Sequence, residues 1–287
     1  MNVYEIITEQ IVKKLESGVI PWRRPWSAEM PCNLVSGKEY RGINPFMLGT
    51  QGYGSKFWVT FNQVKTLGGH VKKGEKSSTV IFWKIGDKKL VQKPDGTSRE
   101  EKSFLLRYYS VFNIAQTEGI EAPDTKPAMP SIETCEAILA GMPNAPRREQ
   151  SEKGWYKPSK DTVGMPAKEL FQTPEGYYST LFHELTHSTG HASRIGREGI
   201  ENLNEFGSES YSKEELVAEM GSAMLCGVAG IAPATLENSA AYLQNWLERL
   251  KADSRLLVSA ASQAQKACDY IRGTVAKSET ETESEEA

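Results

Sequence analysis

The chain has 287 residues, of which 39% are hydrophobic and 25% charged, and its net charge is −3; this length allows one large domain or two modest ones. The four cysteines form no CxxC pair, no apolar run approaches the roughly 20 residues of a membrane helix, and the N-terminus is unlike a secretory signal. These features argue against a membrane protein or a disulfide-stabilised secreted protein and predict a cytoplasmic one.

The first half of the chain predicts one helix followed by a sheet. Apolar residues recur at helical spacing in residues 3–18, and Gly18 ends that pattern. Three later segments are rich in the β-branched and aromatic residues that favour strands: residues 56–61, 78–84 and 105–114. A Pro-Asp-Gly turn signal lies at 94–96. We therefore predict a mixed α/β domain with a mainly antiparallel sheet over residues 1–125.

A linker is predicted where the composition changes. The segment EAPDTKPAMPS, residues 121–131, contains three prolines and little apolar content, and we place the linker itself at residues 126–131. The charge changes sign there as well: residues 1–126 carry 19 Lys and Arg against 13 Asp and Glu, whereas residues 127–287 carry 15 against 24. A basic front half and an acidic back half predict different binding partners.

The second half, residues 132–275, predicts a mostly helical domain. Helical patterns cover residues 131–142, 175–191, 212–230 and 238–273, and short strands are expected at 154–159 and 161–166. Ser212 and Glu215 have the spacing of a capping box at a helix start. Residues 276–287 are rich in glutamate and predict a disordered acidic tail. The whole chain is therefore expected to be an α+β protein.

The sequence HELTH, residues 183–187, predicts a metal site. On a helix, His183 and His187 project from the same face one turn apart and can bind one Zn²⁺ ion. Glu184 lies beside them and can take a proton from a water at the ion. Because the chain has only four histidines, a chance match on a predicted helix is a weak explanation.

The third ligand can come from several residues. His191 follows His187 by four residues, but three histidines along one helix do not converge easily on a tetrahedral ion. A carboxylate on the next predicted helix is the stronger candidate. We assign Glu215 as the third ligand and Glu219, one turn later, as the residue that orients a histidine through its free ring nitrogen. The reverse assignment stays open, because Glu219 lies in an apolar stretch where an unpaired carboxylate is costly.

Two histidines, one carboxylate and a water around one Zn²⁺ ion are suited to amide hydrolysis, because the ion polarises the carbonyl and activates the water. Such a site predicts a protein or peptide substrate. The strand expected at 161–166 precedes the histidine helix and offers an edge with which an extended peptide can pair.

The front half combines cations with aromatic residues. In IPWRRPWS, two arginines lie between two tryptophans. Cations contact phosphates and aromatic rings stack on unpaired bases, so this composition favours single-stranded nucleic acid, although aromatic strands also build ordinary β cores. No zinc-finger or basic-zipper pattern is present. The candidate DNA-binding residues are Trp22, Arg23, Arg24, Trp26, Lys38, Tyr40, Arg41, Lys72, Lys73 and Lys76.

The chain resembles a known family over nearly its whole length. The motifs IPWRRPW, GKEYRGIN, KFWVTFNQVKTLGGHVKKGEKS and YYSVFNIAQTEGI are similar to the N-terminal domain of ArdC-type antirestriction proteins, which TraC-type primases share. The motifs DTVGMP, YYSTLFHELTHSTGHASRIGRE, FGSESYSKEELVAEMGSAMLC and NSAAYLQNWLERLKAD resemble the zincin-like metallopeptidase domain that follows it. Only the acidic tail lies outside the resemblance.

The resemblance implies an N-terminal domain that binds single-stranded DNA, a gluzincin-like domain, and a role in protecting mobile DNA, such as a plasmid, that enters a new host. His183, Glu184 and His187 match the family's motif directly, and Glu215 falls where a third ligand is expected. Two functions are therefore predicted: a zinc metallopeptidase delivered by DNA binding, or a single-stranded-DNA-binding protein whose metal site is structural. Glu184 favours the first, because a structural site needs no base.

Overall fold

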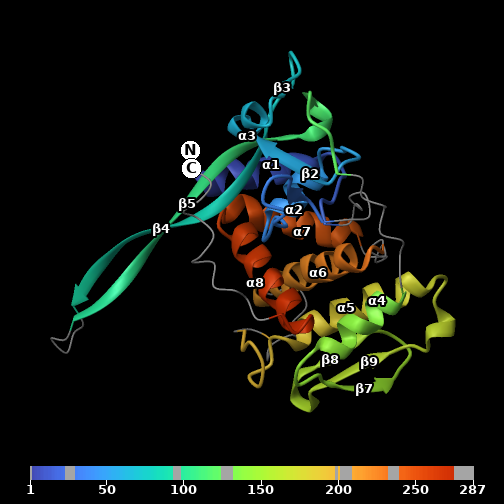
Figure 1. Ribbon diagram of the computed structural model, residues 1–287. Helices are drawn as coiled ribbons and strands as arrows, with labels where there is room; N and C mark the ends of the chain where they lie inside the picture. The colour runs from blue at the N-terminus through green and yellow to red at the C-terminus, as the bar shows by residue number, and fades with distance from the viewer. Residues whose placement is uncertain are drawn as a thin grey trace.

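The computed structural model describes residues 2–22, 30–92, 98–123, 132–197, 200, 209–231 and 239–274, and for 84–92, 98–104, 209–210 and 239–243 it describes the backbone alone. The N-terminal elements lie at one end of the molecule and a small C-terminal sheet at the other, with the last helices between them (Figure 1). Within these ranges, no helix is long and apolar enough to cross a membrane.

The N-terminal part is built on a four-stranded sheet in the order β1-β2-β5-β4. The β1-β2 pairing is parallel and the other two pairings are antiparallel, which confirms the mainly antiparallel sheet. A second sheet joins β3 to β6. The elements are α1 (Val3–Glu16), β1 (Cys32–Asn33), α2 (Asn44–Gly49), β2 (Phe57–Thr60), α3 (Phe61–Thr66), β3 (His70–Val71), β4 (Ser78–Gln92), β5 (Ser98–Asn113), the 3-10 helix η1 (Ile114–Gln116) and β6 (Thr117–Glu118).

Strands β4 and β5 form a hairpin that is longer than the sequence predicted. Their antiparallel pairing runs from Ser78 opposite Val111 to Gln92 opposite Ser98, with one irregularity between Ile85 and Lys88. The far half of this hairpin extends well away from the rest of the molecule (Figure 1). The turn signal at 94–96 falls outside the described residues. The expected strands at 78–84 and 105–114 are thus the inner half of a much longer ribbon.

A buried asparagine covers the edge of this sheet. Asn44, at the start of α2, donates from its amide to the carbonyl of Ile81 and accepts from the N–H of Ile81, both at 2.8 Å. This reciprocal pair imitates a neighbouring strand, so the exposed edge of β4 is satisfied there. It also explains why the short helix α2 lies against β4.

Where the structure describes it, the C-terminal part contains four long helices, a shorter one and a three-stranded sheet in the order β7-β9-β8. The sheet lies against α5 (Figure 1). The elements are α4 (Ile132–Gly141), β7 (Arg147–Gln150), β8 (Trp155–Lys157), the 3-10 helix η2 (Pro158–Lys160), β9 (Thr162–Met165), the 3-10 helix η3 (Lys168–Leu170), α5 (Pro174–Ser188), α6 (Glu209–Ala229), α7 (Ser239–Ala252) and α8 (Leu256–Ile271).

Three local expectations for this part were wrong. The strand at 161–166 is not an edge, because β9 pairs with β7 on one side and β8 on the other. Helix α6 begins at Glu209, so Ser212 lies inside it and does not cap it. The last helical segment is two helices, separated at residues 253–255 where Asp253 accepts a hydrogen bond from the Arg255 N–H at 2.9 Å.

The hydrophobic core is continuous between the N-terminal and C-terminal parts. Residues of α1, including Ile7 and Ile11, belong to the same buried cluster as residues of α7 and α8. Trp22 packs edge-on against Trp246 of α7, with ring centroids 5.4 Å apart. The predicted linker, residues 126–131, lies outside the described residues and joins two chain segments that share one core. The predicted acidic tail, residues 276–287, also lies outside the described residues.

Candidate metal centre

Helix α5 carries the three residues of the HELTH motif. The Thr173 side chain accepts a hydrogen bond from the Gly176 N–H, and Pro174 occupies the first helical position, so both the cap and the fixed backbone angle of proline favour a helix here. His183 and His187 then lie one turn apart on one face, as the spacing predicted. His183, Glu184 and His187 are all buried, so the helix directs polar side chains into the protein.

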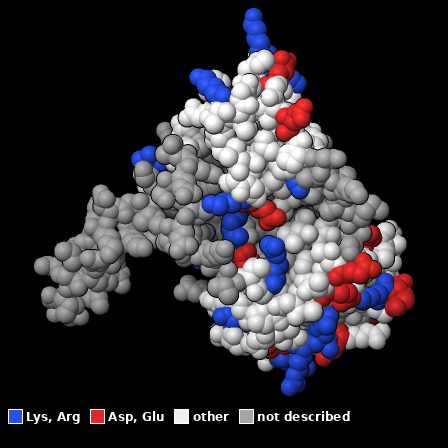
Figure 2. Space-filling view, viewed as in Figure 1, with Lys and Arg blue, Asp and Glu red and all other residues white. Residues whose placement is uncertain are grey.

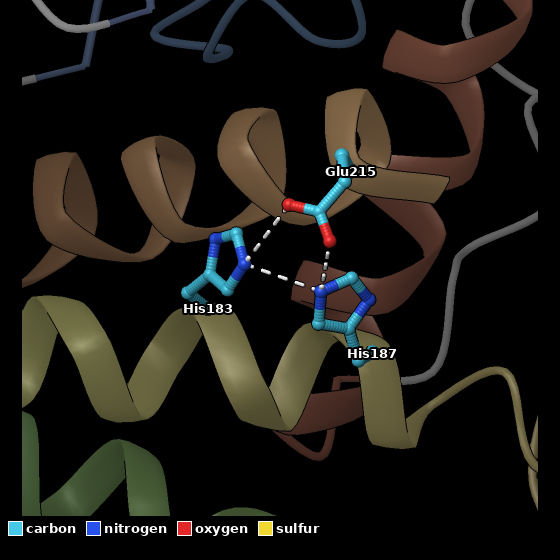
Figure 3. A group of neighbouring side chains, drawn as sticks. All are labelled: His183, His187 and Glu215. Atoms are coloured by element: carbon cyan, nitrogen blue, oxygen red, sulfur yellow. Dashed lines mark hydrogen bonds and ion pairs between the residues drawn. The ribbon is translucent and has the colours of Figure 1, made fainter. Parts of the chain in front are cut away.

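Helix α6 crosses α5 closely and brings a carboxylate to the histidines. At the crossing, a Cβ on Gly221 would lie only 2.6 Å from the Thr186 methyl group, so only glycine permits this approach. The Ser222 hydroxyl donates to the Ser179 carbonyl at 2.8 Å across the same contact. This packing fixes the N-terminal turns of α6, and with them Glu215, beside the two histidines (Figure 3).

The three side chains converge on one point (Figure 3). The Nε2 atoms of His183 and His187 are 3.2 Å apart. Glu215 Oε2 lies 3.7 Å from the Nε2 of His183, and Glu215 Oε1 lies 3.5 Å from the Nε2 of His187. The ligand atoms of a tetrahedral zinc ion, with bonds of about 2.0–2.2 Å, are about 3.3–3.6 Å apart. Two imidazoles and one carboxylate at these separations therefore fit a single divalent ion.

A second carboxylate orients His187, and it comes from Glu214. One oxygen of Glu214 lies 3.3 Å from His187 Nδ1, so a proton on Nδ1 leaves the lone pair of Nε2 facing the other two ligand atoms. The sequence had given this role to Glu219, which lies one turn further along α6. Successive helical residues point about 100° apart, so Glu214 and Glu215 can contact the two different nitrogens of the His187 ring. Sequence spacing alone does not reveal which glutamate contacts which nitrogen.

Arg197 holds Glu214 in turn. Its guanidinium donates to both carboxylate oxygens, from Nε at 3.0 Å and from Nη2 at 2.5 Å. Nη2 also donates to the Thr186 carbonyl at 2.8 Å, and Nη1 donates to the Thr189 hydroxyl. Arg197 thereby ties the segment after α5 to both helices. The motif STGHASRIGRE contains this arginine, but its spacing gave it no role, because its partner is seventeen residues away on another element.

Burial and neighbouring charges act in opposite directions on the acids and bases of the centre. Burial lowers the pKa of His187, but the carboxylates of Glu214 and Glu215 outweigh that effect and raise it to about 10. Burial raises the pKa of Glu215, but His187 and His183 lower it to about 2. The shift of Glu215 favours the ionised carboxylate, which is the form that binds a metal ion, whereas a bound ion must displace the second proton of His187.

Glu184 differs from Glu215 in this respect. Burial raises the pKa of Glu184, and the nearby histidines only partly oppose that effect. Its carboxylate lies against Gly154, where an added Cβ would be 3.2 Å from Oε1 and 2.8 Å from the Thr180 methyl group. Gly154 directly precedes β8, the edge strand of the small sheet, so this edge borders the candidate base.

The remaining histidine of the cluster does not join the centre. His191 lies after the end of α5, and its Nδ1 contacts the Ser193 hydroxyl at 2.8 Å. Among the described residues, the group that could hold a metal ion consists of His183, His187 and Glu215. His191 instead belongs to a turn that Arg194 fixes, through two bonds of 2.8 and 2.7 Å to the carboxylate of Asp161.

The structure distributes the predicted DNA-binding residues among very different environments. Trp22 and Tyr40 are buried, at 1% and 5% exposure, and the Arg41 guanidinium pairs with the buried Asp269 of α8. Trp22 and Tyr40 are therefore core residues in this fold, and Arg41 connects the two parts of the chain. The Gly42 N–H adds a 3.0 Å bond to Gln265 beside that pair.

The predicted lysines remain at the surface. Lys38, Lys73 and Lys76 are exposed, and Lys72 donates to the Ala115 carbonyl at 2.9 Å. The turn after β3, which carries residues 72–76, lies at the opposite end of the molecule from the small sheet β7-β9-β8 (Figure 1). Figure 2 shows lysine and arginine mixed with acidic residues over this side of the molecule rather than gathered in one patch. The candidates Arg23, Arg24 and Trp26 fall outside the described residues.

Comparisons with known proteins agree with this architecture. Residues 1–112 match the model of the N-terminal domain of anti-restriction factor ArdC, and residues 133–263 match that of a zincin-like metallopeptidase. The crystal structure of the antirestriction protein ArdC from plasmid R388, in its metal-free form, is 37% identical, with a TM-score of 0.77 over 95% of this chain and 97% of that one. The chain belongs to the ArdC family of antirestriction proteins. The Mn(II)-bound form of the same ArdC has a TM-score of 0.75.

Other relatives of this ArdC family member differ in length. Protein y4eC of Sinorhizobium fredii is 33% identical over 285 residues, which cover 94% of this chain and 91% of that protein. Two DNA primases TraC of Escherichia coli are each 32% identical over 93% of this chain, but the chain spans only 27% and 20% of their lengths. The ArdC-like region is therefore a small part of those primases.

Proposed function

We propose that this antirestriction protein is a metal-dependent peptidase whose N-terminal part binds single-stranded DNA. The observation that carries the peptidase function is the convergence of His183, His187 and Glu215 beside Glu184. Two imidazoles and a carboxylate suit Zn²⁺, and we propose one such ion. Because a related ArdC has been crystallised with Mn(II), metal analysis of the purified protein is needed to identify the ion.

A divalent ion held by these three side chains would polarise a substrate carbonyl and make a water more acidic. The rest of the chemistry falls to the protein. Glu184 takes the proton of the attacking water and passes it to the departing amine, and burial, which raises its pKa, makes it a stronger base than an exposed carboxylate. An extended substrate can pair with β8, whose free edge leads to Gly154 and Glu184.

The alternative function is a DNA-binding protein whose metal is structural, and Glu184 separates the two. Glu184→Gln keeps the shape of the side chain but removes the base, so hydrolysis of denatured casein should fall by about 10²- to 10⁴-fold while metal content stays unchanged. The assay should be run with and without single-stranded DNA, with Glu175→Gln on the same helix as the control. Metal loss from Glu184→Gln, or wild-type protein that holds metal and never cleaves, would favour the structural function.

Single-stranded DNA binding is supported by a separate observation. Among the described residues, aromatic side chains such as Phe82 and Tyr109 are exposed in the N-terminal part. Exposed aromatic faces combined with a net positive segment suit stacked, unpaired bases. The four cysteines are buried and form no disulfide, which is consistent with action in the reducing cytoplasm, where incoming DNA would be protected.

A further inference from the structure

The inner half of the β4-β5 hairpin presents aromatic and basic side chains on one face. Phe82 and Arg107 are register partners, and so are Val80 and Tyr109. Partners across a ladder, and residues two apart along a strand, project to the same side of a sheet. Phe82, Leu105, Arg107 and Tyr109 therefore share one face, which we call the hairpin face, while Tyr108 projects to the other.

The rings of the hairpin face are exposed and in mutual contact. Phe82 is 38% exposed and Tyr109 43% exposed, and their ring centroids lie 5.7 Å apart at an interplanar angle of 66°. Phe82 also contacts the ring of the buried Tyr40, at 6.2 Å. Tyr40, which the sequence suggested as a direct DNA contact, thus supports Phe82 from beneath.

The charge of this face suits an anionic partner. Arg107 is exposed beside Phe82, and no hydrogen bond or ion pair with another described residue occupies its guanidinium. Among the residues of this face whose side chains the structure describes, none is a carboxylate: they are Ser78, Val80, Phe82, Leu105, Arg107, Tyr109 and Val111. Two adjoining rings offer surfaces for bases, and a free guanidinium offers donors for a phosphate.

The geometry points to the hairpin face as the place where unpaired bases of single-stranded DNA stack, with Arg107 on the adjacent phosphate. This inference rests on the proposed DNA binding. It places the bound DNA on the hairpin face and not on the motif IPWRRPWS. Recognition through ring faces requires bases free of a complementary strand, so the face selects single strands over duplexes. Stacking does not depend on base identity, so it confers little sequence preference.

The test measures fluorescence anisotropy of a labelled short oligothymidylate with the full-length protein. Phe82→Ala and Tyr109→Ala should each raise the Kd about 5- to 100-fold, the range expected when one stacking ring is lost. Tyr109→Phe keeps a ring and should bind like wild type. Arg107→Ala should weaken binding and reduce the slope of log K against log salt by about 0.7, as expected for one phosphate contact.

Tyr108→Ala is the matched control. Tyr108 is a neighbouring tyrosine on the same strand, more exposed at 56%, but on the opposite face, so its removal should change the Kd less than about twofold if the face assignment is right. Circular dichroism on every variant verifies folding, and a duplex of the same length should bind equally to wild type and Tyr109→Ala.

Two results would overturn the inference while leaving the proposed function intact. One is wild-type affinity in Phe82→Ala and Tyr109→Ala, and the other is an equal loss in Tyr108→Ala. If Tyr109→Ala instead disrupts a wild-type dimer in sedimentation and leaves the DNA Kd unchanged, the hairpin face is a protein interface and the inference fails. If the wild-type protein does not bind the oligonucleotide at all, the proposed DNA-binding function fails with it.

Discussion

The metal centre and the hairpin face depart from ordinary protein architecture in opposite ways. At the centre, His183, Glu184 and His187 are polar side chains buried in a helical core. On the hairpin face, Phe82 and Tyr109 are aromatic side chains exposed to solvent. Both arrangements give up stability, because buried charge must be compensated and exposed apolar surface forgoes burial.

The two regions differ in how the loss of stability is compensated. Arg197 donates to Glu214, which lies beside His187, whereas His183 Nδ1 is buried without a hydrogen-bond partner among the described residues. The exposed rings contact each other, but much of their surface remains open. A centre whose side chains are held largely by internal contacts is organised before a ligand arrives, whereas an open face is completed by its partner.

The largest expected effect is a loss of stability, and it tests whether Trp22 is a core residue or a DNA-binding residue. Trp22→Ala should destabilise the protein by about 3–5 kcal/mol, because it empties a buried site between α1 and α7 that Trp246 shares. Urea unfolding measures the loss, with Tyr108→Ala as an exposed-ring control that should change stability by less than about 1 kcal/mol. The DNA Kd of the folded variant should match wild type. If the variant binds DNA more weakly while its stability is unchanged, Trp22 contacts DNA directly, as the sequence suggested.

The sequence could predict which side chains of the candidate centre lie together, because their spacing is local. A spacing of four residues on a helix fixes where His183 and His187 point, whatever the surrounding fold. Glu215 could be ranked above its neighbours only by helical spacing, and Glu214 was missed because its role depends on how α6 crosses α5. Arg197 lies within a family-like motif, but nothing in that motif links it to Glu214, and only the folded chain brings the two together.

The N-terminal surface was predicted poorly for the complementary reason. Trp22, Tyr40 and Arg41 lie in segments that read as aromatic and basic, but tertiary packing places the two rings in the core and pairs Arg41 with Asp269. Composition cannot distinguish a ring that stacks on a base from one that packs on another ring. The continuous core between the two parts is likewise invisible to a linker signal, which reports only that the chain is irregular there.

The next effect concerns the third ligand. Glu215→Ala should lower metal affinity by more than the 10- to 100-fold that loss of an outer residue typically costs, since it removes a ligand atom. Competition with a chromophoric chelator measures the affinity. Glu219→Ala, one turn along the same helix, is the matched control and should change affinity little. If Glu219→Ala loses the metal and Glu215→Ala keeps it, the reverse ligand assignment is correct.

Arg197 should have a smaller effect on the same measurement. Arg197→Ala leaves Glu214 without its donors, so His187 loses its orientation and metal affinity should fall about 10- to 100-fold. Arg194→Ala is the matched control: its side chain is equally buried on the same segment, but it bonds Asp161 and not Glu214. It should lower stability and leave the affinity of the folded protein unchanged. If both variants lose metal affinity equally, Arg197 stabilises the fold in general and does not act specifically through Glu214.

The smallest effect is a pH dependence in the turn beyond the centre. Burial alone would raise the pKa of Asp161, but hydrogen bonds from Arg194 and Tyr156 lower it below the ordinary value of 3.8. A carboxyl group with a lowered pKa contributes stability that is present above its unfolded pKa and is lost as the pH falls through the folded pKa.

Melting temperatures measured between neutral pH and pH 3 should therefore fall less steeply below about pH 4 in Asp161→Asn than in wild type, because asparagine has no proton to gain. Asparagine also tolerates the left-handed backbone of this position, φ +46°, so the comparison isolates charge from conformation. Metal affinity at neutral pH should not change, since the turn bonds to Arg194 and not to a ligand. A parallel acid profile in the two proteins would show that the buried polar network around the centre does not extend its stabilising role to this turn.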